Sequence, residues 1–405
     1  MATDLRVLAR APELRGRARS RTIGGIETEL ARIWSSTSRE VALPDGSTER
    51  RIAARTSVMN LVVVARQPET AERAVDAIRG LTARHPSRTL VLATADPDGP
   101  GALDARIEAY CVPARADAGE MCSESVFLTA GGETGRHLAA VVAPLLIHDL
   151  PVAVWWPGDP PLGAMASHEL LELADRLVVD GSSWSGDGFE RVRMLATLDL
   201  DPRLFIVDFA MARQARWREA IAATFDRPDL RPAVRGLRRI EVDYAAAADD
   251  LPGATNVVRP LYHVAWLASR LGLTVEAPLA PAAGGYAGVL RNGHHRVEVA
   301  LRPKAGRHVH GGHDGRGHRV THAAGTTLAV RLGAVTRGRT VSVDVHAEAD
   351  AVLVDARVDG AELPERRFLA PRRTEAGLLS DALEAIAADH VAAGTLRMAA
   401  AIAGP

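Results

Sequence analysis

The stretch "MNLVVVARQPETAERAVDAIRGLTARHPSRTLVLAT", residues 59–94, decides the fold class of this 405-residue chain. It opens with a continuous apolar run rich in β-branched residues, which is typical of a strand covered on both faces. The next segment places apolar side chains at helical spacing, with Pro68 suited to the first turn and Pro86 at the end. A second apolar run, residues 88–94, follows. A strand, a helix and a strand in about 35 residues predict a βαβ unit and a parallel strand pair.

The sequence on the C-terminal side continues this pattern. Residues 103–111 and 122–130 alternate between apolar and polar side chains and predict an antiparallel pair around a polar loop. Three further apolar runs, "PVAVWW" (151–156), "LVVD" (177–180) and "RLFIVDFA" (203–210), alternate with helical segments and predict more buried strands.

The second half of the chain has a different pattern. An amphipathic helix is expected at residues 257–273, with Gly272 at its C-terminal cap. Alternating runs follow, with "RNGH" as a hairpin signal, and an alanine-rich helix is expected at residues 378–394. This order of elements is typical of an antiparallel sheet flanked by helices.

We therefore expect two domains. Residues 21–245 should form an α/β domain with a mixed, largely parallel sheet and flanking helices. Residues 255–405 should form an α+β domain with an antiparallel sheet. The arginine-rich residues 1–20 are expected to be disordered, and the histidine- and glycine-rich residues 305–323 to be a flexible insertion.

Composition excludes several classes of protein. Hydrophobic residues make up 47% of the chain, charged residues 24%, and the net charge is −1, as in ordinary soluble globular proteins. A nucleic-acid-binding protein would usually be strongly basic. The sequence shows neither a secretory signal nor an apolar run of membrane-spanning length. The chain has only two cysteines, which is typical of a cytoplasmic protein. Together, these features predict a cytoplasmic protein that binds neither nucleic acid nor membrane.

Common catalytic and cofactor motifs are missing from the sequence. It contains no GxGxxG after a strand, no P-loop, no GxSxG, no HExxH and no CxxC. We therefore expect no cofactor and assign no catalytic residue. Asp149, Asp159, Asp180 and Asp208 could supply acid/base pairs, but nothing in the sequence defines the distances between them.

Three loops follow consecutive expected strands and form the candidate binding surface. The carboxyl ends of parallel strands share one edge of a sheet, where ligands of α/β proteins usually bind. Tryptophan faces with aspartate and serine suit a sugar phosphate or a protein partner; alternatively, these residues cap helices and cover the sheet end. The candidate partner- or ligand-binding residues are Trp155, Trp156, Pro157, Asp159, Asp180, Ser182, Ser183, Trp184, Asp208, Arg213 and Trp217.

Two smaller groups of residues leave alternatives open. Cys111 and Cys122 face the same side of the expected hairpin, and they form either a redox-sensitive disulfide or two separate buried thiols, which we favour. His308, His310 and His313 lie in the segment "RHVHGGHDGRGHRVTH" and are weak candidates for Zn²⁺ or Ni²⁺ ligands. Their spacing matches no helix or strand, so we expect no metal site.

Several stretches, in chain order, resemble the OpcA family of glucose-6-phosphate dehydrogenase assembly proteins. They are "HPSRTLVL", "CSESVFLTA", "HLAAVVAPLLIHDLPVAVWWPGDPP", "LADRLVVDGSS", "WREAIAATFDRPDLRPAVRGLRRIEV" and "LYHVAWLASRLGL". The resemblance runs from about residue 25 to about residue 275, weakens in the strand-rich second half, and is most distinctive at "DLPVAVWWPGDPP". The segment "DFAMARQARW" departs from the family pattern, with Met211 where an aromatic residue is expected.

The resemblance implies a protein that is not an enzyme. Members of this family are regarded as helping glucose-6-phosphate dehydrogenase to assemble or as activating it allosterically, at the entry to the oxidative pentose phosphate pathway. The proline-rich turn Pro157–Pro161 agrees with this, since proline stiffens a loop and reduces the entropy lost on docking. The alternatives from the residues alone are an enzyme or sensor of a sugar phosphate and a metal-binding protein.

Overall fold

The computed structural model describes most of the chain. The described residues are 12–36, 38–42, 48–52, 57–94, 98–113, 120–246, 252–282, 284–293, 295–305, 323–385 and 389–405. They divide into two compact units, and the chain passes between these units more than once. The first unit contains residues 1–179, 203–205 and 374–386, and the second contains residues 180–202, 206–373 and 387–405.

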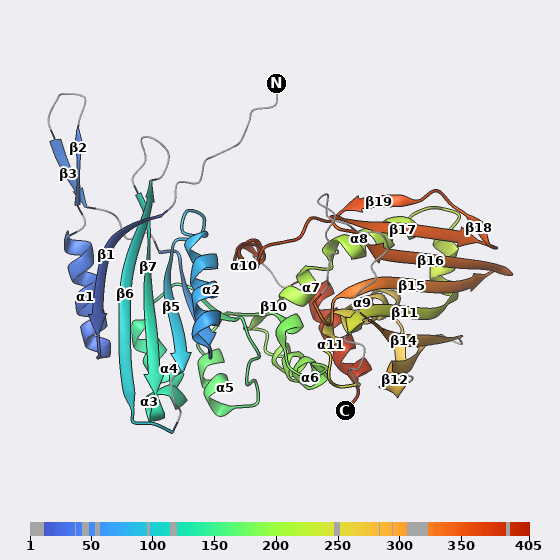
Figure 1. The fold of residues 1–405 in the computed structure, drawn as a ribbon, viewed down its shortest axis with the longest axis horizontal. Helices are drawn as coiled ribbons and strands as arrows, with labels where there is room; N and C mark the ends of the chain where they lie inside the picture. Colours follow the sequence, from blue (N-terminus) through green and yellow to red (C-terminus); the bar gives the residue numbers. More distant parts are fainter. Residues whose placement is uncertain are drawn as a thin grey trace. The chain divides into compact units, whose positions relative to one another are not determined.

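The first sheet has eight strands in the order β1-β6-β7-β5-β4-β8-β9-β10 (Figure 1). Its strands are β1 (Glu13–Ser20), β4 (Met59–Ala65), β5 (Ser87–Thr94), β6 (Ala102–Pro113), β7 (Glu120–Gly131), β8 (Val152–Trp156), β9 (Arg176–Val179) and β10 (Phe205–Asp208). The five strands from β7 to β9 in this order are parallel to one another, while β6 and β1 are antiparallel to their neighbours. The predicted βαβ unit, hairpin and largely parallel sheet are therefore confirmed.

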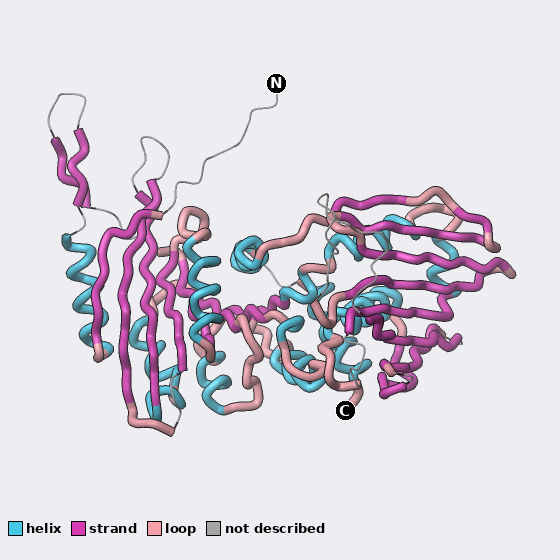
Figure 2. Tube along the Cα trace, viewed as in Figure 1, coloured by secondary structure: helices cyan, strands magenta, loops and turns pink. Residues whose placement is uncertain are grey.

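Short helices accompany this sheet (Figure 2). They are α1 (Ile23–Ser36), α2 (Pro68–Arg79), α3 (Gly132–Arg136), α4 (Leu138–Val142), α5 (Met165–Leu171) and α10 (Glu375–Glu384), with a separate two-stranded sheet of β2 (Ser38–Ala42) and β3 (Thr48–Ile52). The central strand β4 is buried along its whole length, as its continuous apolar sequence predicts.

The second sheet has nine strands, with β11 near its middle (Figure 1). Its strands are β11 (Leu237–Ala246), β12 (Thr274–Ala282), β13 (Gly285–Asn292), β14 (His295–Ala305), β15 (Thr327–Thr336), β16 (Arg339–Ala347), β17 (Ala351–Val358), β18 (Ala361–Glu362) and β19 (Arg366–Leu369). The helices of this unit are α6 (Phe189–Leu198), α7 (Phe209–Ala212), α8 (Ala215–Phe225), α9 (Val258–Leu271) and α11 (His390–Ala403). Helices α8 and α9 pack on the sheet, and α11 packs on α9 and α6.

The second sheet is not purely antiparallel as we expected. Strand β11 pairs antiparallel with β15 but parallel with β14. We also placed β11 in the first domain, whereas it belongs to the second unit, which begins at Asp180 instead of near residue 255. Alternating apolar residues predict a strand with one covered face, but they specify neither its partner nor its direction.

Both ends of the described chain differ from expectation. Residues 1–20 were expected to be disordered, but Glu13–Ser20 form β1. This strand pairs with β6 through its backbone, which needs no apolar side chains. In addition, Arg17 forms an ion pair with the buried Glu108. The single helix expected at residues 378–394 is two helices, α10 and α11. Asp389 starts the second helix by accepting hydrogen bonds from two of its backbone N–H groups.

Among the described residues, no helix has both the length and the apolar character needed to cross a membrane.

Candidate functional site

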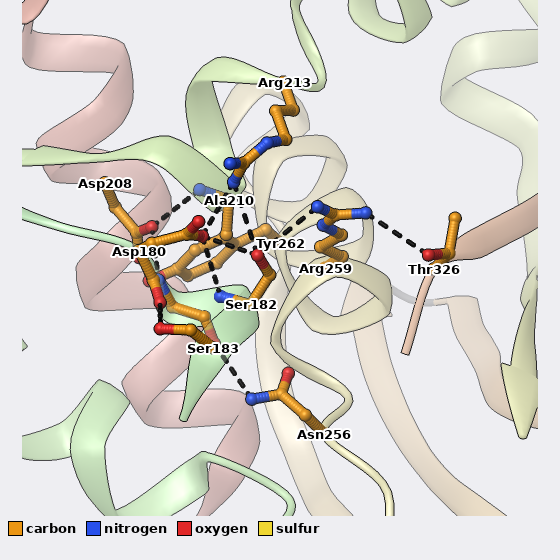
Figure 3. A network of polar contacts seen from close by, with 11 residues as sticks. Asp180, Ser182, Ser183, Asp208, Ala210, Arg213, Asn256, Arg259, Tyr262 and Thr326 are labelled. Atoms are coloured by element: carbon orange, nitrogen blue, oxygen red, sulfur yellow. Dashed lines mark hydrogen bonds and ion pairs between the residues drawn. The ribbon is translucent and has the colours of Figure 1, made fainter. Parts of the chain in front are cut away.

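A cluster of polar side chains lies in the second unit, where the chain leaves β9 and β10 (Figure 3). The first residue after β9 is Asp180, and the last residue of β10 is Asp208. Both side chains cap the short helical segments that follow, η2 (Gly181–Ser183) and α7. Helix α9 contributes Arg259 and Tyr262 to the same cluster.

Asp208 is the buried centre of this cluster, with 5% of its surface exposed. Its Oδ1 accepts hydrogen bonds of 2.8 Å from the backbone N–H groups of Gly181 and Ala210, and its Oδ2 accepts one of 2.8 Å from the Tyr262 hydroxyl. Position 181 requires glycine, because a Cβ there would lie 2.7 Å from Asp208 Oδ2. Burial raises the pKa of Asp208 to about 6, despite these hydrogen bonds.

Asp180 connects the loop after β9 to the C-terminal end of α7. Its Oδ1 accepts hydrogen bonds from the Ser182 N–H at 3.1 Å and from the Ser182 hydroxyl at 2.5 Å, and it forms a 2.7 Å ion pair with Arg213 Nη1. The Ser183 hydroxyl donates to the Asp180 carbonyl at 2.8 Å. Asn256 holds the same loop from the other side by donating to the carbonyl oxygens of Gly181 and Trp184.

Arg259 approaches the cluster from the first turn of α9 (Figure 3). Its Nη2 lies 3.3 Å from the Ser182 hydroxyl, and its Nη1 lies 3.4 Å from the Thr326 hydroxyl. Burial, followed by the nearby Arg213, lowers the pKa of Arg259, and Asp180 and Asp208 only partly offset these effects.

The side of α9 next to Arg259 buries a neutral histidine. His263 is 1% exposed, and neither ring nitrogen has a hydrogen-bond partner among the described residues. Burial and the nearby Arg218 and Arg259 lower its pKa to about 3. The ring of Trp217 packs against it with centroids 5.2 Å apart.

The two carboxylates of this cluster act as hydrogen-bond acceptors that order the loops. Every carboxylate oxygen of Asp208 faces a hydrogen-bond donor of the protein, and the side chain is buried. Asp180 is similarly engaged by Ser182 and Arg213. The guanidinium groups of Arg213 and Arg259 are half-buried and are able to contact a ligand.

The predicted site residues separate into two sets. Asp180, Ser182, Ser183, Asp208 and Arg213 are brought together in the second unit, as described above. Of the other candidates, Trp155, Trp156, Pro157 and Asp159 belong to the first unit. Trp184 and Trp217 belong to the second unit, where the Trp184 carbonyl accepts a hydrogen bond from Asn256 and the Trp217 ring packs against His263.

The tryptophans expected at a binding surface are mostly core residues. Trp155 and Trp156 are 0% and 3% exposed, because β8 lies between β4 and β9 and is covered on both faces. Trp184 is 3% exposed. Pro157 is buried too, whereas Asp159 is half-buried in the turn that follows. The turn therefore rests on a buried strand that ends in two tryptophans.

The two cysteines form a disulfide, which corrects our preference for separate thiols. Cys111 of β6 lies directly opposite Cys122 of β7, with Cα atoms 4.1 Å apart. Sequence alternation placed both on one face, but only the register of the hairpin shows that they are opposite. His308, His310 and His313 lie outside the described residues.

The first sheet has the strand order of dinucleotide-binding sheets. Its strands β7-β5-β4-β8-β9-β10 correspond to the order 3-2-1-4-5-6, in which a glycine-rich turn after the first strand holds a pyrophosphate at a helix N-terminus. Here β4 is followed by Arg66, Gln67 and Pro68, which starts α2 and lacks an N–H. Glu69 adds a negative charge to the first turn. These residues do not fit a pyrophosphate.

Sequence reasoning missed the contribution of α9. Arg259, Tyr262 and His263 come from a helix whose apolar stripe was recognised, but whose polar residues were not considered. A usable signal was present, since an arginine, a tyrosine and a histidine within five positions interrupt an otherwise apolar helix. Thr326 precedes β15 and carries no comparable signal.

Comparison with protein families gives two matches. The family profile described as "Glucose-6-phosphate dehydrogenase subunit N-terminal domain" (OpcA) matches residues 78–196. The profile of the C-terminal domain of the same family matches residues 205–393.

Curated relatives show the same similarity. The "Putative OxPP cycle protein OpcA" of Synechocystis sp. is 29% identical over 195 residues, which are 48% of this chain and 39% of that protein. The protein of the same name from Synechococcus elongatus is 27% identical over 176 residues, which are 43% of this chain and 37% of that protein. The matched region thus spans well under half the length of these relatives.

Solved structures resemble the chain more distantly. A 3-ketoreductase from Actinomadura kijaniata gives a TM-score of 0.45 at 12% identity, covering 85% of this chain and 95% of that one. A biliverdin reductase from Synechocystis sp. also gives 0.45, at 9% identity, covering 85% and 98%. Values this low support no inference about activity.

Proposed function

Because this chain belongs to the OpcA family of glucose-6-phosphate dehydrogenase assembly proteins, we propose that it is a non-enzymatic partner of that dehydrogenase. It binds the enzyme, favours its active assembled state, and so acts on the oxidative pentose phosphate pathway from the cytoplasm. The single observation that carries the proposal is the match of both family domains along the chain, over residues 78–196 and 205–393.

The geometry of the two sheets supports a binding role over a catalytic one. The carboxylates at the ends of β9 and β10 are engaged by backbone N–H groups, hydroxyls and Arg213. The turn after β4 has residues that do not fit a dinucleotide. A protein needs no catalytic group to shift the population of an enzyme's states, because binding one of these states more tightly is sufficient.

The turn after β8 is the contact that we propose for the dehydrogenase. Its prolines reduce the entropy lost on docking, and the buried strand beneath it holds its position. Met165, which begins α5 four residues after Pro161, has 76% of its surface exposed. An exposed, flexible methionine beside a rigid turn is suited to packing against an apolar patch of a partner.

The experiment compares Met165→Glu with Leu200→Glu in binding to the dehydrogenase from the same genome. Leu200 is a matched control in the second unit, because it is 70% exposed and equally apolar. We expect the wild-type chain to raise the oligomer mass of the enzyme or lower its apparent KM. Met165→Glu should weaken binding about tenfold or more, since a charge at a packed contact costs at least about 1.4 kcal/mol, whereas Leu200→Glu should bind like the wild type.

Two results separate the parts of this proposal. If neither oligomer mass nor KM changes at several-fold excess of the wild-type chain, the proposed function is wrong. If the wild-type chain acts but the two variants bind equally well, the function stands and the assigned contact is wrong. Changes at Trp155 or Trp156 are unsuitable here, because both are core residues and their loss would unfold the chain.

A further inference from the structure

Two arginines of the second unit share one hydroxyl group (Figure 3). Arg213 Nη1 and Arg259 Nη2 each lie 3.3 Å from Ser182 Oγ. That oxygen is itself committed as a donor to Asp180 Oδ1 at 2.5 Å. Two guanidinium groups therefore meet at a single, weakly accepting oxygen atom.

The positive charge at this point is only partly compensated. Arg213 has an ion pair with Asp180, and its side chain is 24% exposed. Arg259 has no ion pair within the part of the chain that the structure describes; its contacts there are the long hydrogen bonds to the Ser182 and Thr326 hydroxyls. Its Nε is buried and has no hydrogen-bond partner among those residues.

Asp208, the other carboxylate nearby, makes no hydrogen bond to Arg259, and together with Asp180 it offsets only part of the lowering of the Arg259 pKa by burial and Arg213. Both oxygens of Asp208 are directed at Gly181, Ala210 and Tyr262. Water could satisfy the donors of Arg259, but it brings no charge. A half-buried cation that has only hydroxyl partners is unfavourable unless an anion joins it.

Guanidinium groups bind oxyanions through paired N–H donors. Arg213 and Arg259, with the Thr326 hydroxyl next to Arg259, offer several N–H and O–H donors to the oxygens of one anion, and the charge of Arg259 has no ion-pair partner among the described residues. We propose that Arg213, Arg259 and Thr326 form a binding site for a phosphate monoester. The phosphate group lies against the two arginines, and the rest of the ligand extends toward solvent.

The test uses the isolated full-length chain in phosphate-free buffer, so its outcome does not depend on the dehydrogenase. The thermal midpoint is measured with increasing inorganic phosphate or glucose 6-phosphate, against sodium chloride at equal ionic strength. Bound ligand stabilises the folded state by mass action, so we expect a saturable rise with a phosphate compound and none with chloride.

The variants are Arg259→Gln, Arg259→Lys and the control Arg270→Gln, an exposed arginine in the last turn of the same helix. Arg259→Gln should raise the Kd for phosphate at least tenfold, and without phosphate it should be no less stable than the wild type, since a poorly compensated cation is removed. Arg259→Lys should give an intermediate Kd, because the charge remains but the paired donors are lost. Arg270→Gln should bind like the wild type.

Comparing the Kd values of the two ligands shows whether the site recognises a sugar phosphate or the phosphate group alone. A Kd for glucose 6-phosphate at least tenfold below that for inorganic phosphate indicates recognition of the sugar as well, and equal values indicate recognition of the phosphate alone. The proposal is overturned if neither compound raises the midpoint above the chloride control, or if Arg259→Gln and Arg270→Gln respond equally. If Arg259→Gln does not fold, an unchanged Kd in Arg259→Lys overturns it instead.

Discussion

At the scale of single residues, Asp208 shows how one side chain organises two loops. It joins the turn after β9, the start of α7 and the middle of α9 through three hydrogen bonds. The carboxylate is desolvated in this position, and burial raises its pKa from 3.8 to about 6. The same contacts that order the loops therefore make the ionised form costly at neutral pH.

This pKa predicts how stability depends on pH. Between 3.8 and about 6 the folded state binds more protons at this carboxyl than the unfolded state does. The contribution of Asp208 to the free energy of unfolding is therefore present at low pH and is lost as the pH rises through about 6, by about 3 kcal/mol in total.

Asp208→Asn removes this titration while keeping the hydrogen bonds. The amide oxygen can accept from Gly181 and Ala210, and the amide nitrogen can donate to the Tyr262 oxygen. In urea unfolding, the free energy of unfolding of the variant relative to the wild type should increase by about 2 kcal/mol between about pH 4 and about pH 7. A difference that is constant across this range would show that Asp208 titrates normally.

At the scale of elements, the β6–β7 hairpin combines a backbone ladder with a covalent link. Cys111 and Cys122 are opposite residues in this antiparallel pair, 11 positions apart in the chain. The link closes a short loop, so in the chain-entropy description it stabilises the fold by restricting the unfolded state.

Replacing both cysteines measures this stabilisation. Cys111→Ala/Cys122→Ala should lower the free energy of unfolding by about 2–3 kcal/mol, the value expected for a closed loop of about 12 residues. Adding dithiothreitol should destabilise the wild type by a similar amount and leave the double variant unchanged. If the reductant affects neither protein, the two sulfurs are not bonded under the conditions used.

At the scale of the whole molecule, the units are built from separated parts of the chain. Helix α10 belongs to the first unit, where Glu384 forms an ion pair with Arg84, and Leu383 accepts a 2.8 Å hydrogen bond from Arg176. Helix α11, which follows directly, belongs to the second unit and packs on α9. Neither unit is complete without the last part of the sequence.

Truncation tests this arrangement. A fragment of residues 1–373 loses α10 from the first unit and α11 from the second, which removes the carbonyl partners of Arg176 and uncovers the apolar face of α9. It should be insoluble or lack a cooperative thermal transition, whereas residues 1–403, which end with α11, should retain one. An unchanged midpoint in the shorter fragment would mean that both helices are dispensable.

Much of the first sheet follows from local pattern alone. The apolar runs of β4, β5 and β8 predicted strands covered on both faces, and the alternation in β6 and β7 predicted a hairpin. The loops that carry Asp180 and Asp208 were expected at one edge of the sheet, because the carboxyl ends of parallel strands share that edge, but the sequence did not define the distance between the two carboxylates. The strands and the hairpin were predicted correctly because hydrophobic period depends on residues that are close in sequence.

Sequence pattern alone predicts the mixed architecture, the family, and the aspartates at the ends of two strands. Three features become visible only in the folded chain: Trp155 and Trp156 are core residues, β11 pairs with β14, and Arg259 and Arg213 approach the same hydroxyl group. The reason is physical. A residue's type and spacing predict its own element, whereas its burial and its charge partners depend on segments distant in the chain, which come together only when the whole chain folds.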